Sequence, residues 1–213
     1  MMFYRLILLS LLMLSVACQE QMQVPADERY PWQITLTTSG SSSIFGVVLN
    51  ETRLADAVNR LGRHYKIALF AETEDKLSLE VYYADFTRSG LSGRLVLTLD
   101  AGNDVLQTLK SKAGRGERLE SGVIQYKLGA QVEPVIRDLM VRAMTYLPYA
   151  DLKPEVAKAR FGTPAEVIRS HAKAEHWLYP DKGLDMILTE EGRDILQYVP
   201  PNRFADLVRP LKP

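Results

Sequence analysis

The order of apolar and polar residues along the chain predicts a mixture of strands and helices. Apolar and polar residues alternate over 32–37, which indicates a strand, and a second short apolar run covers 44–49. Residues 54–61 instead place apolar side chains three, four and seven positions apart, which is a helical spacing. Asn50 precedes this helix as a candidate N-cap, and Gly62 follows it as a candidate C-terminal cap.

The next part of the chain continues this alternation of element types. Segments 66–71, 77–83 and 94–99 are rich in β-branched, aromatic and leucine side chains and are separated by turn residues, which predicts three antiparallel strands. Within the second strand, Tyr82 and Tyr83 must point to opposite faces, so one is expected in the core. A helix is expected from residue 103, a strand at 122–128 and an amphipathic helix at 132–146.

Pro148 separates a smaller unit from this first body. A short helix at 152–161 ends in Gly162-Thr163-Pro164, and candidate strands follow at 175–180, 184–189 and 194–199, joined by tight turns that contain glycine. We therefore expect an α+β fold of antiparallel sheets with packed helices. The expected domains are an α+β body at 32–147 and a small unit of one helix and three strands at 148–213.

An internal similarity relates the two expected domains. Shifting the chain by 100 residues aligns Arg60, Leu61 and Gly62 with Arg160, Phe161 and Gly162, and strands follow the glycine in both cases. One interpretation is that the chain contains two related helix-plus-meander units. The other is that any two helices ending in a glycine align in this way, and the sequence leaves both open.

The N-terminus has the pattern of a signal peptide. Arg5 precedes an apolar stretch over 6–14, and small residues follow. The stretch is shorter than the roughly 20 residues that a membrane-spanning helix requires. Residues 1–17 are therefore predicted to be removed.

Residues Leu14-Ser15-Val16-Ala17-Cys18 resemble the lipobox of bacterial lipoproteins, with Ser15 at a position where a larger aliphatic residue is usual. The resemblance implies that Cys18 carries fatty acyl chains such as palmitate and is the first residue of the mature chain. Gln19 stands where an aspartate is associated with inner-membrane retention, which implies the periplasmic face of the outer membrane. The alternative is an ordinary secretory peptide cleaved near Ala17, which would leave Cys18 as a free thiol exposed to oxidation.

The polar segment at 18–31 contains Pro25 and Pro31 and has no regular period, so it is expected to be a flexible tether. A coil of this length reaches roughly 20 Å. The expected anchored state is thus a folded body held just off the lipid surface.

Composition excludes several classes of partner and cofactor. The chain has 213 residues, of which 26 are basic and 26 acidic, so it lacks the excess of positive charge that nucleic-acid binding requires. Its single cysteine excludes an internal disulfide framework, and three scattered histidines do not suggest a metal site. No cofactor and no metal are expected.

No arrangement of catalytic residues stands out. His64 follows a capping glycine, and His171 and His176 lie five positions apart, which is neither a helical metal pair nor a same-face strand pair. These histidines are expected to be hydrated or hydrogen-bonded loop residues. The serine-rich loop at 39–43 lacks the spacing of a nucleophile elbow, and no catalytic residue is predicted.

The C-terminal unit resembles the SmpA/OmlA (BamE-like) family of small outer-membrane lipoproteins. The resemblance rests on the helix stop Phe161, Gly162 and Pro164 and on Trp177 and Tyr179 in the strand that follows. It covers about 50 of the 213 residues, the family's usual approach to the helix is missing before Leu152, and the chain is longer than a typical member. It implies a scaffolding role beside envelope or barrel-assembly proteins. Independently of the resemblance, Trp177 is expected in the core next to Gly162.

These features together predict a non-catalytic binding or scaffolding module in envelope assembly or maintenance, anchored in the outer membrane through Cys18. The first alternative is a carrier of a lipid or small apolar ligand, which would need a cavity lined by the apolar faces of strands in 66–99. The second alternative is a periplasmic enzyme of unknown type.

Overall fold

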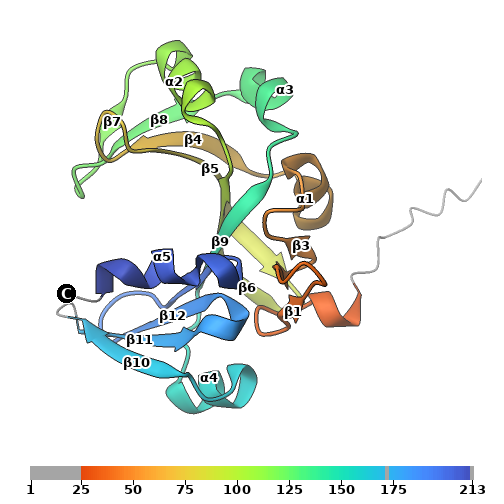
Figure 1. The fold of residues 1–213 in the computed structure, drawn as a ribbon. Coiled ribbons are helices and arrows are strands. Elements are labelled where there is room, and N and C mark those ends of the chain that lie inside the picture. Colours follow the sequence, from red (N-terminus) through yellow and green to blue (C-terminus); the bar gives the residue numbers. More distant parts are fainter. Residues whose placement is uncertain (1–24, 171–172, 212–213) are drawn as a thin grey trace, which may run out of the picture.

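The computed structural model describes residues 25–170 and 173–211, and their fold is α+β with antiparallel sheets, as the sequence predicts (Figure 1). The helices are α1 (Leu54–Leu61), α2 (Asn103–Lys112), α3 (Glu133–Ile136), α4 (Pro154–Phe161) and α5 (Phe204–Val208). The strands are β1 (Thr35–Leu36), β2 (Ser42–Ile44), β3 (Val47–Val48), β4 (Lys66–Ala71), β5 (Leu77–Arg88), β6 (Leu91–Leu99), β7 (Glu117–Arg118), β8 (Ile124–Leu128), β9 (Val141–Pro148), β10 (Glu166–Ser170), β11 (Ala174–Tyr179), β12 (Leu184–Thr189) and β13 (Ile195–Tyr198). Strands β1 to β3 form a small sheet, and the others form one ten-stranded sheet in the order β10-β11-β12-β13-β9-β6-β5-β4-β8-β7.

Apart from β7 and β8 at one end, the large sheet is centred on the antiparallel pair of β9 and β13, in which Tyr146 lies opposite Leu196. Strands β6, β5 and β4 follow on one side of this pair, and β12, β11 and β10 follow on the other. Each side therefore consists of a helix and then four strands that pair in chain order, with the last strands of the two sides joined. Helices α2 and α3 and strands β7 and β8 are an insertion before β9.

Matching contacts mark the ends of α1 and α4. Gly62 follows α1 with φ of +107°, and Gly162 follows α4 with φ of +88°. The Tyr83 hydroxyl donates to the Gly62 carbonyl at 3.1 Å, and the Tyr179 hydroxyl donates to the Gly162 carbonyl at 3.0 Å. Both tyrosines lie on the second strand after their helix. Whether the two halves descend from one repeated unit stays open between the two interpretations given above.

The main hydrophobic core lies on the convex side of the bent sheet. Alternate side chains of β5 and β6 are buried there, including Leu79, Val81, Leu95 and Leu97, and α1 to α4 place their buried residues in the same cluster. Tyr83 belongs to this cluster and is 3% exposed. Since Tyr146, Phe161 and Tyr198 are members as well, one core and one sheet continue across the domain boundary expected at residue 148.

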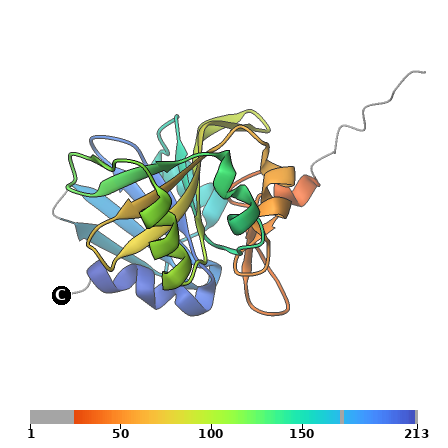
Figure 2. The same ribbon diagram turned by 90° about the horizontal axis from the view of Figure 1, so that it is seen from above.

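Helix α5 lies on the opposite, concave face of the sheet (Figures 1 and 2). Leu178 and Tyr179 are neighbours on β11 and therefore point to opposite faces. Tyr179 joins the main core, whereas Leu178 packs against Phe204 and Val208 of α5. In the described chain no helix packs on the concave face of β4 to β6, because α1 to α4 all pack into the convex core.

The amphipathic helix predicted at 132–146 is wrong. Helix α3 ends at Ile136, and Val141–Pro148 form the central strand β9. Leu139 and Met140 extend the helical spacing of the apolar residues, but the buried residues of the strand are Val141, Met144, Tyr146 and Pro148. Strand pairing on both sides and burial in the core outweigh the local helical pattern here.

The first described residues pack on the body, although the tether was expected to extend to residue 31. Pro31 is buried, and its carbonyl accepts a hydrogen bond of 3.0 Å from the Tyr198 hydroxyl. The Trp32 ring meets the edge of Phe161 with centroids 6.2 Å apart. Residues 28–31 therefore belong to the folded body and not to a tether.

Two arginines hold this N-terminal segment from opposite helices. Arg60 of α1 pairs with Glu28 at 3.4 Å, and the guanidinium of Arg160 of α4 lies 4.9 Å from the centroid of the Trp32 ring. These are the arginines that a shift of 100 residues aligns. The segment thus enters the body beside both helix ends.

Among the residues that the structure describes, no helix has the length and apolar character that crossing a membrane requires.

Candidate binding site in the cleft

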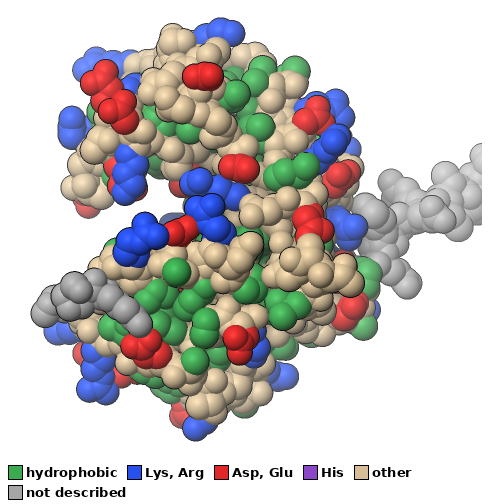
Figure 3. Space-filling view, viewed as in Figure 1, with side chains coloured by type: hydrophobic (Ala, Val, Ile, Leu, Met, Phe, Trp, Pro, Cys, Tyr) green, Lys and Arg blue, Asp and Glu red, His purple; other side chains and the backbone are tan. Residues whose placement is uncertain are grey.

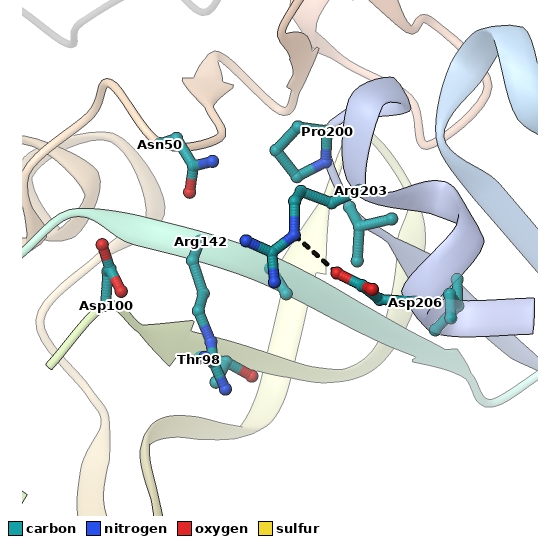
Figure 4. Close-up of a pocket in the computed structure, with 10 residues that line it drawn as sticks. Asn50, Thr98, Asp100, Arg142, Pro200, Arg203 and Asp206 are labelled. Atoms are coloured by element: carbon teal, nitrogen blue, oxygen red, sulfur yellow. Dashed lines mark hydrogen bonds and ion pairs between the residues drawn. The ribbon is translucent and has the colours of Figure 1, made fainter. Parts of the chain in front are cut away.

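A cleft separates α5 from the uncovered concave face of β4 to β6. Figure 3 shows this hollow, with basic and acidic side chains gathered at its inner end. A pocket of about 330 Å³ lies there, between β6, β9 and the start of α5. Its polar lining, drawn in Figure 4, consists of Asn50, Thr98, Asp100, Arg142, Arg203 and Asp206. Its size is at the lower end of the range for small-molecule sites, roughly 300 to 1,000 Å³.

A β-bulge directs Arg142 into this pocket. Thr98 pairs with Ala143 and Leu99 pairs with Val141, so Arg142 has no partner on β6. The bulge interrupts the ladder where the sheet passes from β6 to β9, and bulges of this kind re-aim a side chain beside functional sites. Arg142 is exposed, whereas Val141 next to it is fully buried in the core.

Backbone hydrogen bonds fix two further pocket residues to the same bulge. The Asn50 backbone N–H donates to the Val141 carbonyl at 2.7 Å, and that of Asp100 donates to the Met140 carbonyl at 2.8 Å. Asn50 has φ of +62°, a left-handed conformation that asparagine tolerates better than most residues. It therefore lies in a turn and is not the N-cap of α1, which is Arg53.

An ion-pair cluster forms the side of the pocket next to α5. The Asp206 carboxylate accepts from Arg203 and from Arg209, both at 2.6 Å. These two pairs lower the pKa of Asp206, with the hydrogen bond from Arg203 the largest cause. In Figure 4 the Arg203 side chain reaches from the start of α5 toward Arg142. One carboxylate thus serves two guanidinium groups.

A second carboxylate, Glu80, lies on the concave face near Arg142. Glu80 pairs across the strands with Thr98, which pairs with Ala143. Burial raises the pKa of Glu80, and the hydrogen bond from the Ser78 hydroxyl at 3.1 Å and the charge of Arg142 oppose this. Arg142 therefore interacts electrostatically with the half-buried carboxylate of Glu80.

The pocket keeps several polar groups without partners. Within the described chain, the side chains of Asn50, Thr98 and Asp100 have no hydrogen bond or ion pair, and Arg142 has only its electrostatic interaction with Glu80. These groups are a positively charged guanidinium that donates hydrogen bonds, an amide, a hydroxyl, and a negatively charged carboxylate that accepts them. The site is equipped to bind a polar ligand.

The residues that carry the family resemblances lie elsewhere. Cys18 is outside the described residues. Phe161 and Tyr179 are buried in the convex core, and Trp177 is half-buried against it with its indole N–H donating to Glu175 at 3.1 Å. Tyr179 contacts Gly162 through the hydrogen bond from its hydroxyl. Pro164 is half-buried just before the edge strand β10.

The histidines were expected in loops, and His176 is not in one. It lies on β11 with 8% exposure, and its Nδ1 is 2.8 Å from Oδ2 of Asp185 on β12. Burial raises the pKa of Asp185, and the bond to His176 opposes this. In the described chain His176 has no hydrogen bond to a serine, threonine or cysteine, so the pair is not a nucleophile-activating triad. His171 is outside the described residues.

Sequence reasoning missed the pocket residues because they come from four separate parts of the chain, and only the sheet order brings them together. Comparison of the chain with protein-family models, curated proteins and solved structures found no match. Among the described residues no group of three or more histidine, cysteine or acidic side chains could hold a metal ion. The function is therefore inferred from the cleft and from the N-terminal residues.

Proposed function

We propose that this protein is a non-catalytic binding module anchored to the periplasmic face of a bacterial outer membrane, where it holds a partner in its cleft during envelope assembly or maintenance. The lipobox-like residues that end at Cys18 support the anchor. The uncovered, polar concave face with its pocket supports a binding role for the body.

The observation that carries this proposal is that the cleft opens away from the point where the chain enters the body. In Figure 1 the first described residues lie beside α1 on one side of the molecule, and in the same view Figure 3 shows the cleft opening on the other side. Pro25 follows Cys18 by seven positions, a stretch that spans at most about 25 Å. A bilayer that holds Cys18 would thus face α1 and α4 and leave the cleft open to the periplasm.

Site-specific photo-crosslinking in intact cells tests this arrangement. A crosslinking residue at Thr98 in the cleft should form adducts with an envelope protein, whereas one at Glu155, exposed on α4, should not form the same adducts. The same adducts from both positions, or none from Thr98, would contradict the proposal.

The anchor itself predicts the behaviour of Cys18→Ser. Thioether attachment needs the thiol, so the variant should lack acyl chains and should leave the membrane fraction. Intact-mass measurement and fractionation of the two proteins check this. Membrane retention of the serine variant equal to that of the parent would rule the anchor out.

A second candidate function is carriage of a small apolar ligand, favoured by a groove of about 790 Å³ between α5 and β10. Leu178, Phe204 and Val208 contribute its apolar lining. Such a cavity was expected along the apolar faces of β4 to β6, but the side chains of those faces are packed in the main hydrophobic core. Native mass spectrometry of the protein from cells should show a retained ligand if this function is correct, and an empty protein would exclude it.

A further inference from the structure

The unpaired groups of the central pocket have both signs of charge. Arg142 provides a guanidinium that has no hydrogen bond from the described chain, and Asp100 provides a carboxylate with no partner there. Figure 4 shows Asp100 on one side of Arg142, Arg203 and Asp206 on the other, and Asn50 above. An unpaired carboxylate and an unpaired guanidinium thus line the same pocket.

We infer that this pocket binds a small zwitterion, in which an anionic group and an ammonium group lie a few bonds apart. The inference deepens the proposed function, on which it rests, by naming the chemistry that the cleft recognises. The anionic group would lie against Arg142 and Arg203, and the ammonium group would lie against Asp100. The Asn50 amide and the Thr98 hydroxyl are placed to complete the hydrogen bonds.

Charge balance favours a zwitterion over a simple anion or cation. The pocket lining holds two arginines and two aspartates, and Glu80 and Arg209 add one charge of each sign nearby. A lone anion would be attracted by Arg142 but repelled by Asp100. A lone cation would be attracted by Asp100 but repelled by Arg142. A ligand with both charges pairs each unpaired group and suffers neither repulsion.

The bulge and the turn at Asn50 keep this arrangement in place before a ligand arrives. Arg142 follows directly on Val141, which is fully buried and accepts from the Asn50 backbone, and Asp100 is bonded to Met140. Three of the groups that would contact the ligand are therefore fixed to one short stretch of backbone. Such preorganisation lowers the entropy cost of binding.

Two sources supply zwitterions of this kind: amino acids or peptide ends, which join a carboxylate to an ammonium, and phosphoethanolamine headgroups, which join a phosphate to an ammonium. Isothermal titration of the purified full-length protein with glycine and with glycerophosphoethanolamine separates them. Acetate and methylammonium serve as probes of one charge each.

At least one of the two zwitterions should bind about ten-fold or more tightly than acetate and methylammonium. Arg142→Gln and Asp100→Asn should each lower the affinity for that zwitterion by about ten-fold or more, because each removes one charge-assisted contact. The matched controls Arg115→Gln and Asp75→Asn remove exposed charges in loops that do not line the pocket and should leave binding unchanged. Binding should also weaken as salt is added, since the pocket is open to solvent.

Three results would overturn the inference: neither zwitterion binds, acetate binds as tightly as both of them, or Asp100→Asn has no effect. The measurement uses purified protein and needs no anchor or partner. Its failure is thus distinguishable from failure of the proposed function, which would show as absent adducts from Thr98 in cells.

Discussion

Gly162 illustrates how a single backbone conformation constrains the sequence. Its φ of +88° and ψ of −173° lie in a region that is accessible essentially to glycine alone, and not in the left-handed helical region of a common cap. An added Cβ would meet only Lys182 Nζ at 3.9 Å, so there is no steric clash. Gly162→Ala should therefore cost about 1 to 3 kcal/mol of unfolding free energy through backbone strain alone.

Chemical denaturation of Gly162→Ala and of Gly114→Ala measures this effect. Gly114 has no neighbour within 4 Å of an added Cβ and no positive φ, so its substitution should change stability by no more than about 0.5 kcal/mol. Equal stabilities for the two variants would show that Gly162 is not strained by a side chain.

Asp185 gives the stability of the fold a dependence on pH. Burial raises its pKa above 3.8, so the folded state holds the proton more tightly than the unfolded state. The stabilisation from this proton is complete below the ordinary pKa and is lost as the pH rises through the raised value. The unfolding free energy of the parent relative to Asp185→Asn should therefore fall as the pH rises from 4 toward neutrality.

Denaturation curves of both proteins between pH 4 and 7 test this, with the exposed Asp75→Asn as control. A difference that grows with pH would mean that the bond from His176 outweighs burial. The sequence did not reveal the pair, because His176 and Asp185 become neighbours only through the register of β11 with β12.

Between elements, two tyrosine hydroxyls tie a helix end to a strand. Tyr83 and Tyr179 donate to Gly62 and Gly162, and their rings remain packed if the hydroxyl is removed. Tyr83→Phe and Tyr179→Phe should thus each lower the unfolding free energy by about 1 kcal/mol. Burial also raises the pKa of Tyr179 to about 12, so the stabilisation from its hydroxyl proton is lost as the pH rises from 10 to 12. The unfolding free energy of Tyr179→Phe should therefore fall less steeply over that pH range than that of the parent.

The matched control is Tyr82→Phe on the neighbouring position of β5, which has no hydrogen bond from its hydroxyl within the described chain. Its unfolding free energy should stay within about 0.5 kcal/mol of the parent. A cost equal to that of Tyr83→Phe would show that the loss has another origin.

Element prediction from the sequence succeeded where a short apolar run is bounded by turn residues. Strands 66–71 and 184–189 match β4 and β12 in their bounds, and both are buried over most of their length. It failed at β9, which is paired on both sides, and it missed β10 and α5. The side chains of β10 are mostly exposed, and α5 is only Phe204–Val208, so neither leaves a strong period in the sequence.

For the whole molecule, a single core predicts a single unfolding transition, although the sequence suggested two domains. Leu79 is fully buried on β5, and Leu79→Ala should cost about 2 to 5 kcal/mol. In a Trp32→Phe background, Trp177 on β11 is the sole tryptophan and reports on the other half of the sheet. Its fluorescence midpoint should shift with Leu79→Ala by as much as the far-ultraviolet circular dichroism midpoint.

An unchanged Trp177 midpoint would mean that the halves unfold independently. The sequence could not settle this point, because the pairing of β9 with β13 joins residues about 50 positions apart and leaves no local pattern. The cleft was equally invisible, since it depends on the bend of the sheet and on α5, which packs against β11 on the concave face.

The bond from Tyr198 to Pro31 joins residues 167 positions apart. A chain made from its N-terminus onward therefore cannot complete its first segment until nearly all of it has been synthesised. Contacts this distant in sequence slow folding, because a long loop must close before they form. During that interval the central strand β9 has an open edge, so the nascent chain should depend on a chaperone more than a protein of this size with local contacts does.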